Sequence, residues 1–175
     1  MGKKRICLDP GHYGEKYNAG VVSGYYESAT VWKLTQYEKE YLEQMGIEVL
    51  YGPEYQVKIW DWLREHGDDI DVAYLNRPHI ASKYIDYILD NTDIKVIYYG
   101  HDLHFLRESR EYQITGDPKI REDAEYWKSI ELTLMSKAAV SYYPSYVEIN
   151  AIHAIDGSIH AKAITAYVYL SLIHI

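Results

Sequence analysis

Short hydrophobic runs alternate along the chain with longer stretches in which apolar residues recur every three or four positions. Short apolar runs bounded by turn residues are typical of buried strands, and the wider spacing is typical of amphipathic helices. The predicted strands are Ile6–Leu8, Ile47–Tyr51, Val72–Leu75, Val96–Tyr99, Val140–Tyr143 and Ile164–Val168. Strands that alternate with helices predict an α/β fold, here a Rossmann-like, doubly wound and mostly parallel sheet.

The stretches between these strands carry helix signals. The predicted helices run from Glu27 or Ser28 to Met45, and over Val57–Glu65, His79–Leu89, Pro118–Lys137 and Tyr146–Ala154, with a further helix in the charged run after Asp102. The apolar face expected for the first helix is formed by Val31, Leu34, Tyr37, Tyr41 and Met45. Asp117 is expected to cap the long helix, because an Asp side chain accepts a backbone N–H there and Pro118 loses nothing at the first helical position.

The strongest site candidate lies in the stretch from Asp93 to Tyr112. A β-prone run ends at Gly100 and is followed directly by His101 and Asp102. In open α/β sheets, ligands bind at the carboxyl ends of the strands, so a titratable pair in this position predicts a functional site. The alternative is that His101 and Asp102 only cap the next helix.

A second polar loop, Asn76-Arg77-Pro78-His79, also follows a predicted strand and should lie on the same rim. His101 is the first choice for an acid–base or positioning role, because imidazole titrates near neutral pH. Asp102 could orient it, and Arg77 could bind a phosphate or a carboxylate. The alternatives are a helix cap for His79 and a simple ion pair for Arg77. His104 and Arg107 are expected on a solvated helix face.

Composition narrows the class of protein. A net charge of −8 argues against a nucleic-acid partner, and no apolar run is long enough to cross a membrane. The chain has a single cysteine, Cys7, which excludes an internal disulfide and fits a cytoplasmic location. Twenty tyrosines stand against one phenylalanine, which suits contact with sugars or peptides.

Three motifs resemble a branch of the GT-B glycosyltransferases of bacterial surface-polysaccharide assembly. They are YLNRPHIASKYID (Tyr74 to Asp86), KVIYYGHDLHFLRESREYQITGD (Lys95 to Asp117) and YYPSYVEINAI (Tyr142 to Ile152). The resemblance extends from about Tyr41 to Tyr169. It implies most of the acceptor-side, N-terminal Rossmann-like domain of an enzyme that transfers sugar from a nucleotide-sugar donor to a glycan or lipid-linked acceptor.

The resemblance implies that the two polar loops line the acceptor side and approach the donor sugar. The residues expected to act in catalysis are His101 and Asp102, and those expected to bind substrate are Asn76, Arg77, His79 and Gly100. It implies no cofactor, and a parent enzyme without a transmembrane segment that could be peripheral to the inner membrane. The nucleotide-binding domain has no match in the chain, so the chain alone is expected to be inactive. A noncatalytic saccharide-binding module is the alternative that needs no second domain.

The amino terminus resembles another family. The segments ICLDPGHYGEKYNAG and YYESATVWKL are similar to zinc-dependent N-acetylmuramoyl-L-alanine amidases, in which the residues matching His12 and Glu27 bind zinc. A catalytic zinc needs three protein ligands, and no motif supplies the third in an equivalent place, since His79 and His160 lie in the glycosyltransferase-like part. Any zinc should therefore bind weakly, and a peptidoglycan-cleaving amidase is the alternative function.

The two resemblances predict a chimera. Residues 1–36 form the amidase-like strand, loop and helix start, and residues 37–169 form the partial glycosyltransferase domain, with the junction between Lys33 and Tyr41 inside a helix common to both. The tail Leu170–Ile175 resembles the translation of a sequencing adaptor and is expected to be artefactual.

Overall fold

The computed structural model describes residues 5–7, 24, 26–50 and 53–164, with the backbone alone at 5–7, 27, 50 and 53–57. The chain divides into two compact units, Met1–Leu63 and Arg64–Ile175, and each is described by itself. The predicted boundary near residue 36 concerns the origin of the segments, which this division does not test. None of the helices in the described residues is long and apolar enough to cross a membrane.

The first unit is built on two parallel strands, β1 (Arg5–Cys7) and β2 (Glu48–Leu50), with Ile6 opposite Val49. Helix α1 (Glu27–Gln44) connects them and stops at Gly46, whose φ of +76° favours glycine. Helix α2 (Pro53–His66) follows β2. These elements match the predicted strand, helix and strand, although the predicted ends at Leu8 and Tyr51 lie outside the described residues.

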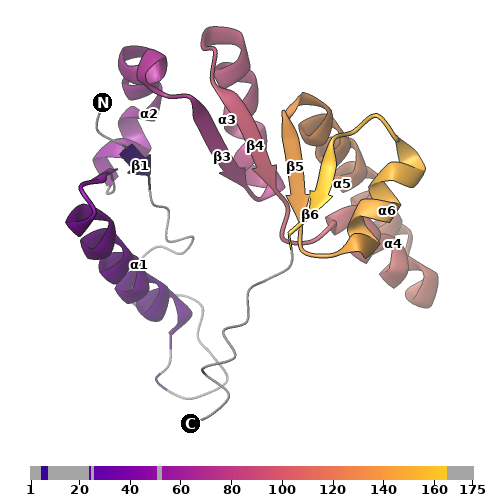
Figure 1. Ribbon diagram of the computed structural model, residues 1–175. Helices are drawn as coiled ribbons and strands as arrows, with labels where there is room; N and C mark the ends of the chain where they lie inside the picture. Colours follow the sequence, from indigo (N-terminus) through magenta and orange to yellow (C-terminus); the bar gives the residue numbers. More distant parts are fainter. Residues whose placement is uncertain (1–4, 8–23, 25, 51–52, 165–175) are drawn as a thin grey trace. The chain divides into compact units, whose positions relative to one another are not determined.

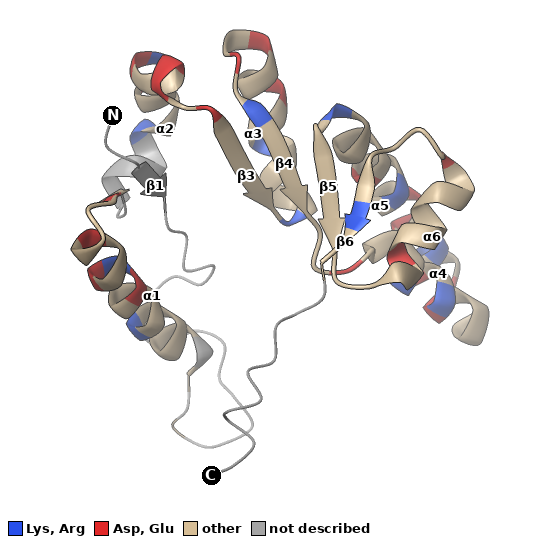
Figure 2. Cartoon of the chain, in the orientation of Figure 1, with Lys and Arg blue, Asp and Glu red and all other residues tan. Residues whose placement is uncertain are grey.

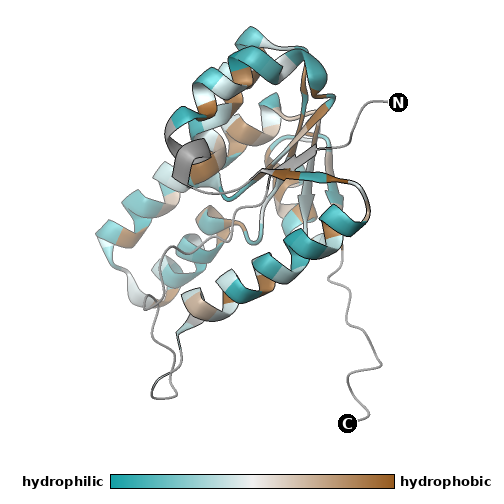
Figure 3. Cartoon of the chain, turned by 90° about the vertical axis from the view of Figure 1, so that its left-hand side faces the viewer, coloured by the Kyte–Doolittle hydropathy of each residue, from teal (hydrophilic) through white to brown (hydrophobic). Residues whose placement is uncertain are grey.

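Four of the five residues predicted to form a buried apolar face on α1 are exposed. Leu34, Tyr37, Tyr41 and Met45 are each about 60% exposed, whereas Ser28 and Thr35 are buried. Figure 3 shows α1 as a mostly hydrophilic helix that carries scattered hydrophobic residues. The Thr35 hydroxyl is satisfied within the helix, where it donates to the carbonyl of Val31 at 2.9 Å. Periodicity therefore located the helix but not its buried face.

The second unit holds a four-stranded, all-parallel sheet in the order β3-β4-β5-β6 (Figure 1). The strands are β3 (Val72–Asn76), β4 (Lys95–Tyr99), β5 (Val140–Tyr143) and β6 (Ala161–Ala163). Helix α3 (Pro78–Asn91) joins β3 to β4, helices α4 (His104–Thr115) and α5 (Pro118–Lys137) join β4 to β5, and α6 (Tyr146–Ile155) joins β5 to β6. This arrangement confirms the predicted α/β, Rossmann-like fold with a parallel sheet.

The core of this unit lies between one face of the sheet and three helices. Val96, Tyr98, Ser141 and Tyr143 are fully or almost fully buried on that face. The helices contribute buried residues at helical spacing: Ala81, Ile85 and Ile88 from α3, Leu134 and Met135 from α5, and Ile149 and Ile152 from α6. Each large aliphatic side chain buried in this way stabilises the fold by about 1.5–3 kcal/mol. The charges gather on the outer faces of the helices, and the strands carry few (Figure 2).

Local sequence signals fix the starts of helices α5 and α6. The Asp117 carboxylate accepts the backbone N–H of Lys119 at 2.9 Å, which confirms the predicted cap of α5. Ser145 and Glu148 form a reciprocal capping box at the start of α6. The last strand was predicted too far along the chain: β6 ends at Ala163, Ile164 is not in a strand, and the rest of Ile164–Val168 lies outside the described residues.

Candidate functional site

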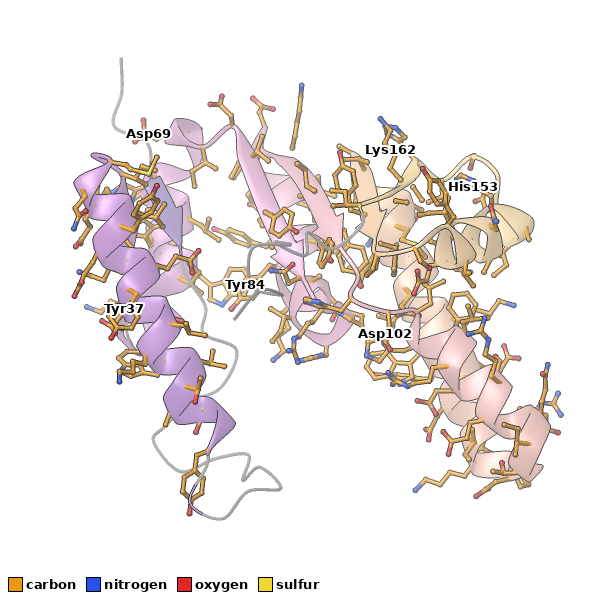
Figure 4. All side chains as sticks on the ribbon, turned by 60° about the horizontal axis from the view of Figure 1, so that its bottom comes forward. Tyr37, Asp69, Tyr84, Asp102, His153 and Lys162 are labelled. Carbon is orange, nitrogen blue, oxygen red and sulfur yellow. The ribbon has the colours of Figure 1, made fainter. Side chains whose placement is uncertain are left out.

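The two predicted polar loops meet at the carboxyl edge of the sheet. Strands β3 and β4 are neighbours in parallel register, with Asn76 opposite Tyr99. The loop that starts at Arg77 therefore lies beside the loop that starts at Gly100. Asp102, labelled in Figure 4, lies between β4 and α4 on this edge. The structure thus brings together the residues that the sequence predicted there.

Gly100 is required by the close packing of Tyr143. A Cβ atom at position 100 would lie 2.1 Å from Cε1 and 2.3 Å from Cζ of the Tyr143 ring, which is fully buried. The Gly100 N–H also donates to the carbonyl of Tyr142 at 2.9 Å, so the turn stays attached to β5. The glycine therefore lets the first turn after β4 pass directly over a core aromatic ring.

Arg77 has a strained backbone at the start of the other loop. Its φ is +59°, which is the left-handed region that side chains other than glycine rarely adopt. Among the described residues its guanidinium group has no ion-pair partner, so the alternative of a simple ion pair is not supported. Strained residues of this kind cluster at functional sites. Pro78 is the first residue of α3, so His79 is its second residue and does not cap the helix.

His101 is exposed and lies against an aromatic row. Its ring meets the Tyr99 ring edge-on at 5.0 Å, and Tyr99 stacks on Tyr74 at 6.0 Å. Partial burial, and next the positive charge of Arg77, lower the pKa of His101 below 6.5. Burial and Arg77 act in the same direction on the pKa of His79. Both imidazoles are therefore mainly neutral at pH 7 and able to accept a hydrogen bond or a proton.

Within the described part of the chain, no hydrogen bond joins Asp102 to the ring of His101. Its carboxylate forms an ion pair with Arg107, which is half-exposed, as expected for a residue on a solvated helix face. One Asp102 oxygen lies 4.0 Å from Nδ1 of His104. Its negative charge raises the pKa of His101, against the larger effect of burial. The interaction described between Asp102 and His101 is therefore the electrostatic effect of the Asp102 charge on the pKa of His101.

Glu131 is a member of the site that sequence reasoning missed. It lies on α5 with no exposed surface, and it accepts the backbone N–H groups of His104 at 2.9 Å and of Phe105 at 3.1 Å. Glu131, rather than His101 or Asp102, thus caps the amino terminus of α4. Burial raises the pKa of Glu131, and the N–H donors oppose that shift. The sequence did carry one signal for this role, since Glu131 is an acidic residue on the same face of α5 as the apolar residues Ala124 and Leu134.

His104 is not on a solvated helix face, contrary to the expectation. Its side chain is 20% exposed, its Nδ1 lies 3.0 Å from Oε1 of Glu131, and its ring lies 4.8 Å from the Trp127 ring. The positive charge of protonated His104 also lowers the pKa of both His79 and His101. The edge therefore carries three histidines and Arg77 within electrostatic reach of one another.

Beneath this edge are the buried hydroxyl groups of Tyr98, Ser141 and Tyr143. Among the described residues the Ser141 hydroxyl has no hydrogen-bond partner, whereas the two phenol hydroxyls interact with each other. The Tyr98 and Tyr143 rings meet edge-on at 6.3 Å, and burial is the main cause that raises the pKa of both phenols. The negative charges of Glu131 and Asp102 raise both further. The tyrosines are therefore neutral groups that pack beneath the site and do not exchange protons with it.

A hollow of about 500 Å³ lies at the other end of the sheet. It is lined by Gly67, Asp68, Asp71, Asp93 and Lys95 among others. Lys95 is the first residue of β4, so this hollow lies at the amino-terminal end of the strand. It contains none of the predicted site residues, and acidic groups on a surface do not by themselves indicate a ligand.

The predicted zinc pair falls mostly outside the described residues. His12 is not among them, and Glu27 is described only as the first residue of α1. Within the described part of the chain, no three His, Cys, Asp or Glu residues are grouped so as to hold a metal ion. The weak zinc site therefore stays a prediction.

Comparisons with protein-family models, curated proteins and solved structures found no match to this chain. The glycosyltransferase and amidase resemblances of its motifs therefore stay predictions. The geometry of the carboxyl edge is what bears on function.

Proposed function

We propose that the second unit is the acceptor-side domain of a GT-B-type glycosyltransferase and that its carboxyl edge binds the acceptor saccharide. The observation that carries this proposal is the meeting of two polar loops there, Asn76 to His79 and Gly100 to Asp102, across the register pair of Asn76 and Tyr99. This is the edge at which parallel α/β sheets bind ligands.

The groups on this edge suit a polyhydroxylated ligand. Neutral imidazoles at His79 and His101 can accept hydrogen bonds from sugar hydroxyls. The guanidinium of Arg77 can donate several, and it fits a carboxylate or a phosphate on the ligand. Tyr74 is 54% exposed and stacked on Tyr99, which offers an aromatic face beside them.

The proposed partners are a glycan or lipid-linked acceptor and a nucleotide-sugar donor, and the proposed location is the cytoplasm. Glycosyl transfer depends on holding the donor diphosphate and the acceptor hydroxyl together. In the resembling family a second domain holds the donor. The direct test on this chain is therefore acceptor binding, and we expect no transfer from a nucleotide sugar.

The test is an array of bacterial surface oligosaccharides probed with the purified chain. We expect binding to a restricted set of glycans, with at least a 10-fold loss in the variant Arg77→Ala, since a charge-assisted hydrogen bond contributes about 1.5–3 kcal/mol. The matched control is Arg121→Ala, an exposed arginine on α5. The proposal is wrong if the chain binds no glycan, or if Arg77→Ala binds as well as Arg121→Ala.

A further inference from the structure

His104 is the one histidine of the carboxyl edge whose ring is held by a buried carboxylate. Oε1 of Glu131 lies 3.0 Å from Nδ1 of His104, and the same carboxylate accepts the backbone N–H groups of His104 and Phe105. Glu131 has no exposed surface and cannot leave this position without breaking all three contacts. The ring is held from another side by Trp127, at 4.8 Å between ring centres.

This contact bears on the protonation of the two ring nitrogens. An ionised Glu131 carboxylate only accepts hydrogen bonds, so opposite it Nδ1 of His104 carries the proton and donates it. In the neutral ring, Nε2 then has a free lone pair. No hydrogen-bond partner of Nε2 lies among the described residues, and the side chain is 20% exposed. A buried carboxylate that holds Nδ1–H and leaves Nε2 open is the arrangement that makes histidine a directed proton acceptor.

We propose that His104 is the proton-accepting group of the carboxyl edge and that Glu131 is its positioning residue. The inference rests on the proposed function. The acceptor hydroxyl gives its proton to Nε2 of His104 while its oxygen bonds to the anomeric carbon of a nucleotide sugar. The bond from that carbon to the phosphate oxygen breaks, and the nucleoside diphosphate leaves with the electron pair.

His104 is better prepared for this task than His101. No hydrogen bond to the ring of His101 is formed within the described residues, and this ring meets the Tyr99 ring at right angles with 5.0 Å between ring centres. The charged groups around His104 are Glu131 below it on α5, and Asp102 at 4.0 Å with its partner Arg107 on the solvent side. An acceptor that binds His101 and Arg77 through its polar groups lies within reach of His104, since all three face one edge.

The first measurement is the tautomer of each histidine, read from long-range proton–nitrogen NMR spectra of the labelled chain above the pH of imidazole protonation. In the wild-type chain we expect His104 to hold its proton on Nδ1, in contrast to the exposed His101. Glu131→Gln, which keeps the shape and removes the charge, should shift His104 to a mixture. The matched control is Glu125→Gln, an exposed glutamate on the same helix, which should change nothing.

The second measurement is the rate at which diethyl pyrocarbonate modifies each histidine, followed by mass spectrometry. This reagent attacks an accessible unprotonated imidazole nitrogen, so it reports on the free lone pair of Nε2. We expect His104 to react in the wild-type chain and to react about 2-fold more slowly in Glu131→Gln, because in a tautomer mixture about half of the rings carry the proton on Nε2. Glu125→Gln should react at the wild-type rate.

The outcomes separate this inference from the proposed function. A His104 proton on Nε2, or equal reactivity in the two glutamine variants, overturns the inference even if the glycan array gives binding. If the Glu131→Gln chain fails to fold, the wild-type tautomer decides alone. If the tautomer is correct and the array shows no glycan, the saccharide proposal fails, and the role of His104 in glycosyl transfer fails with it.

Discussion

The substitution Gly100→Ala tests whether the first turn of the site is supported by the core. The added Cβ would lie 2.1 Å from Cε1, 2.3 Å from Cζ and 2.7 Å from the hydroxyl oxygen of Tyr143. Atoms that are not bonded need more than 3 Å, so the ring or the turn must move by about 1 Å. Tyr143 is fully buried, so its ring cannot move without displacing its neighbours in a close-packed core.

The loss of stability caused by Gly100→Ala has a lower and an upper bound. If the core adapts, overpacking costs about 1–3 kcal/mol. If Tyr143 leaves its position, the loss approaches that of truncating a buried aromatic residue, about 3–5 kcal/mol. We therefore expect a loss of about 1–5 kcal/mol in the free energy of unfolding, depending on how far the core adapts.

The assay is urea unfolding followed by circular dichroism, together with amide exchange of β4 and β5, which reports on the second unit alone. The matched control is Gly157→Ala, because a Cβ at that position has ordinary contact with its nearest neighbour, the carbonyl of His153 at 3.9 Å. Adding Tyr143→Ala removes the obstacle, so Gly100→Ala should cost little in that background. The reasoning is refuted if Gly100→Ala is as stable as Gly157→Ala, or if it costs the same with and without Tyr143.

Three further predictions concern the surroundings of the edge. Glu131→Ala should lower the free energy of unfolding by about 3–5 kcal/mol, because two backbone N–H groups and the His104 ring lose their acceptor. The control Glu125→Ala should change the free energy of unfolding by no more than about 0.5 kcal/mol. Urea unfolding measures both variants. Ser141→Ala should be neutral or stabilising by up to about 1 kcal/mol in the same assay, since its buried hydroxyl has no partner, and a clear loss would contradict this. The pKa of His101, measured by NMR titration, should lie below 6.5. The stability that neutral His101 contributes above pH 6.5 should therefore be lost as the pH falls through its folded-state pKa. Arg77→Gln removes a positive charge and should raise the pKa of His101.

The sequence predicted the fold well because its signals are local. β4 and β5 were expected at Val96–Tyr99 and Val140–Tyr143, where apolar runs end in turn residues, and both are confirmed. The cap at Asp117 is also a local signal. The position of β6 was wrong because Ala161–Ala163 is a weak apolar run, and pairing with β5 rather than propensity selects it.

The candidate site was predicted only in part. Parallel topology places Arg77 and His101 on one edge, so strand ends in the sequence were enough to find them. The partner of His104 could not be predicted from the sequence, because Glu131 is 27 positions away along the chain and the two residues meet through the packing of α4 on α5. The reason for Gly100 was likewise invisible, since it depends on the ring of Tyr143 from the next strand.

The most direct test of saccharide binding at the carboxyl edge is an NMR titration of the nitrogen-labelled chain with the oligosaccharide that gives the strongest array signal. We predict saturable shifts at Arg77 to His79 and at Gly100 to His104, with little change at Asp93 and Lys95 at the opposite end of the sheet. Shifts confined to that opposite end, or no shifts at saturating sugar, would contradict the account.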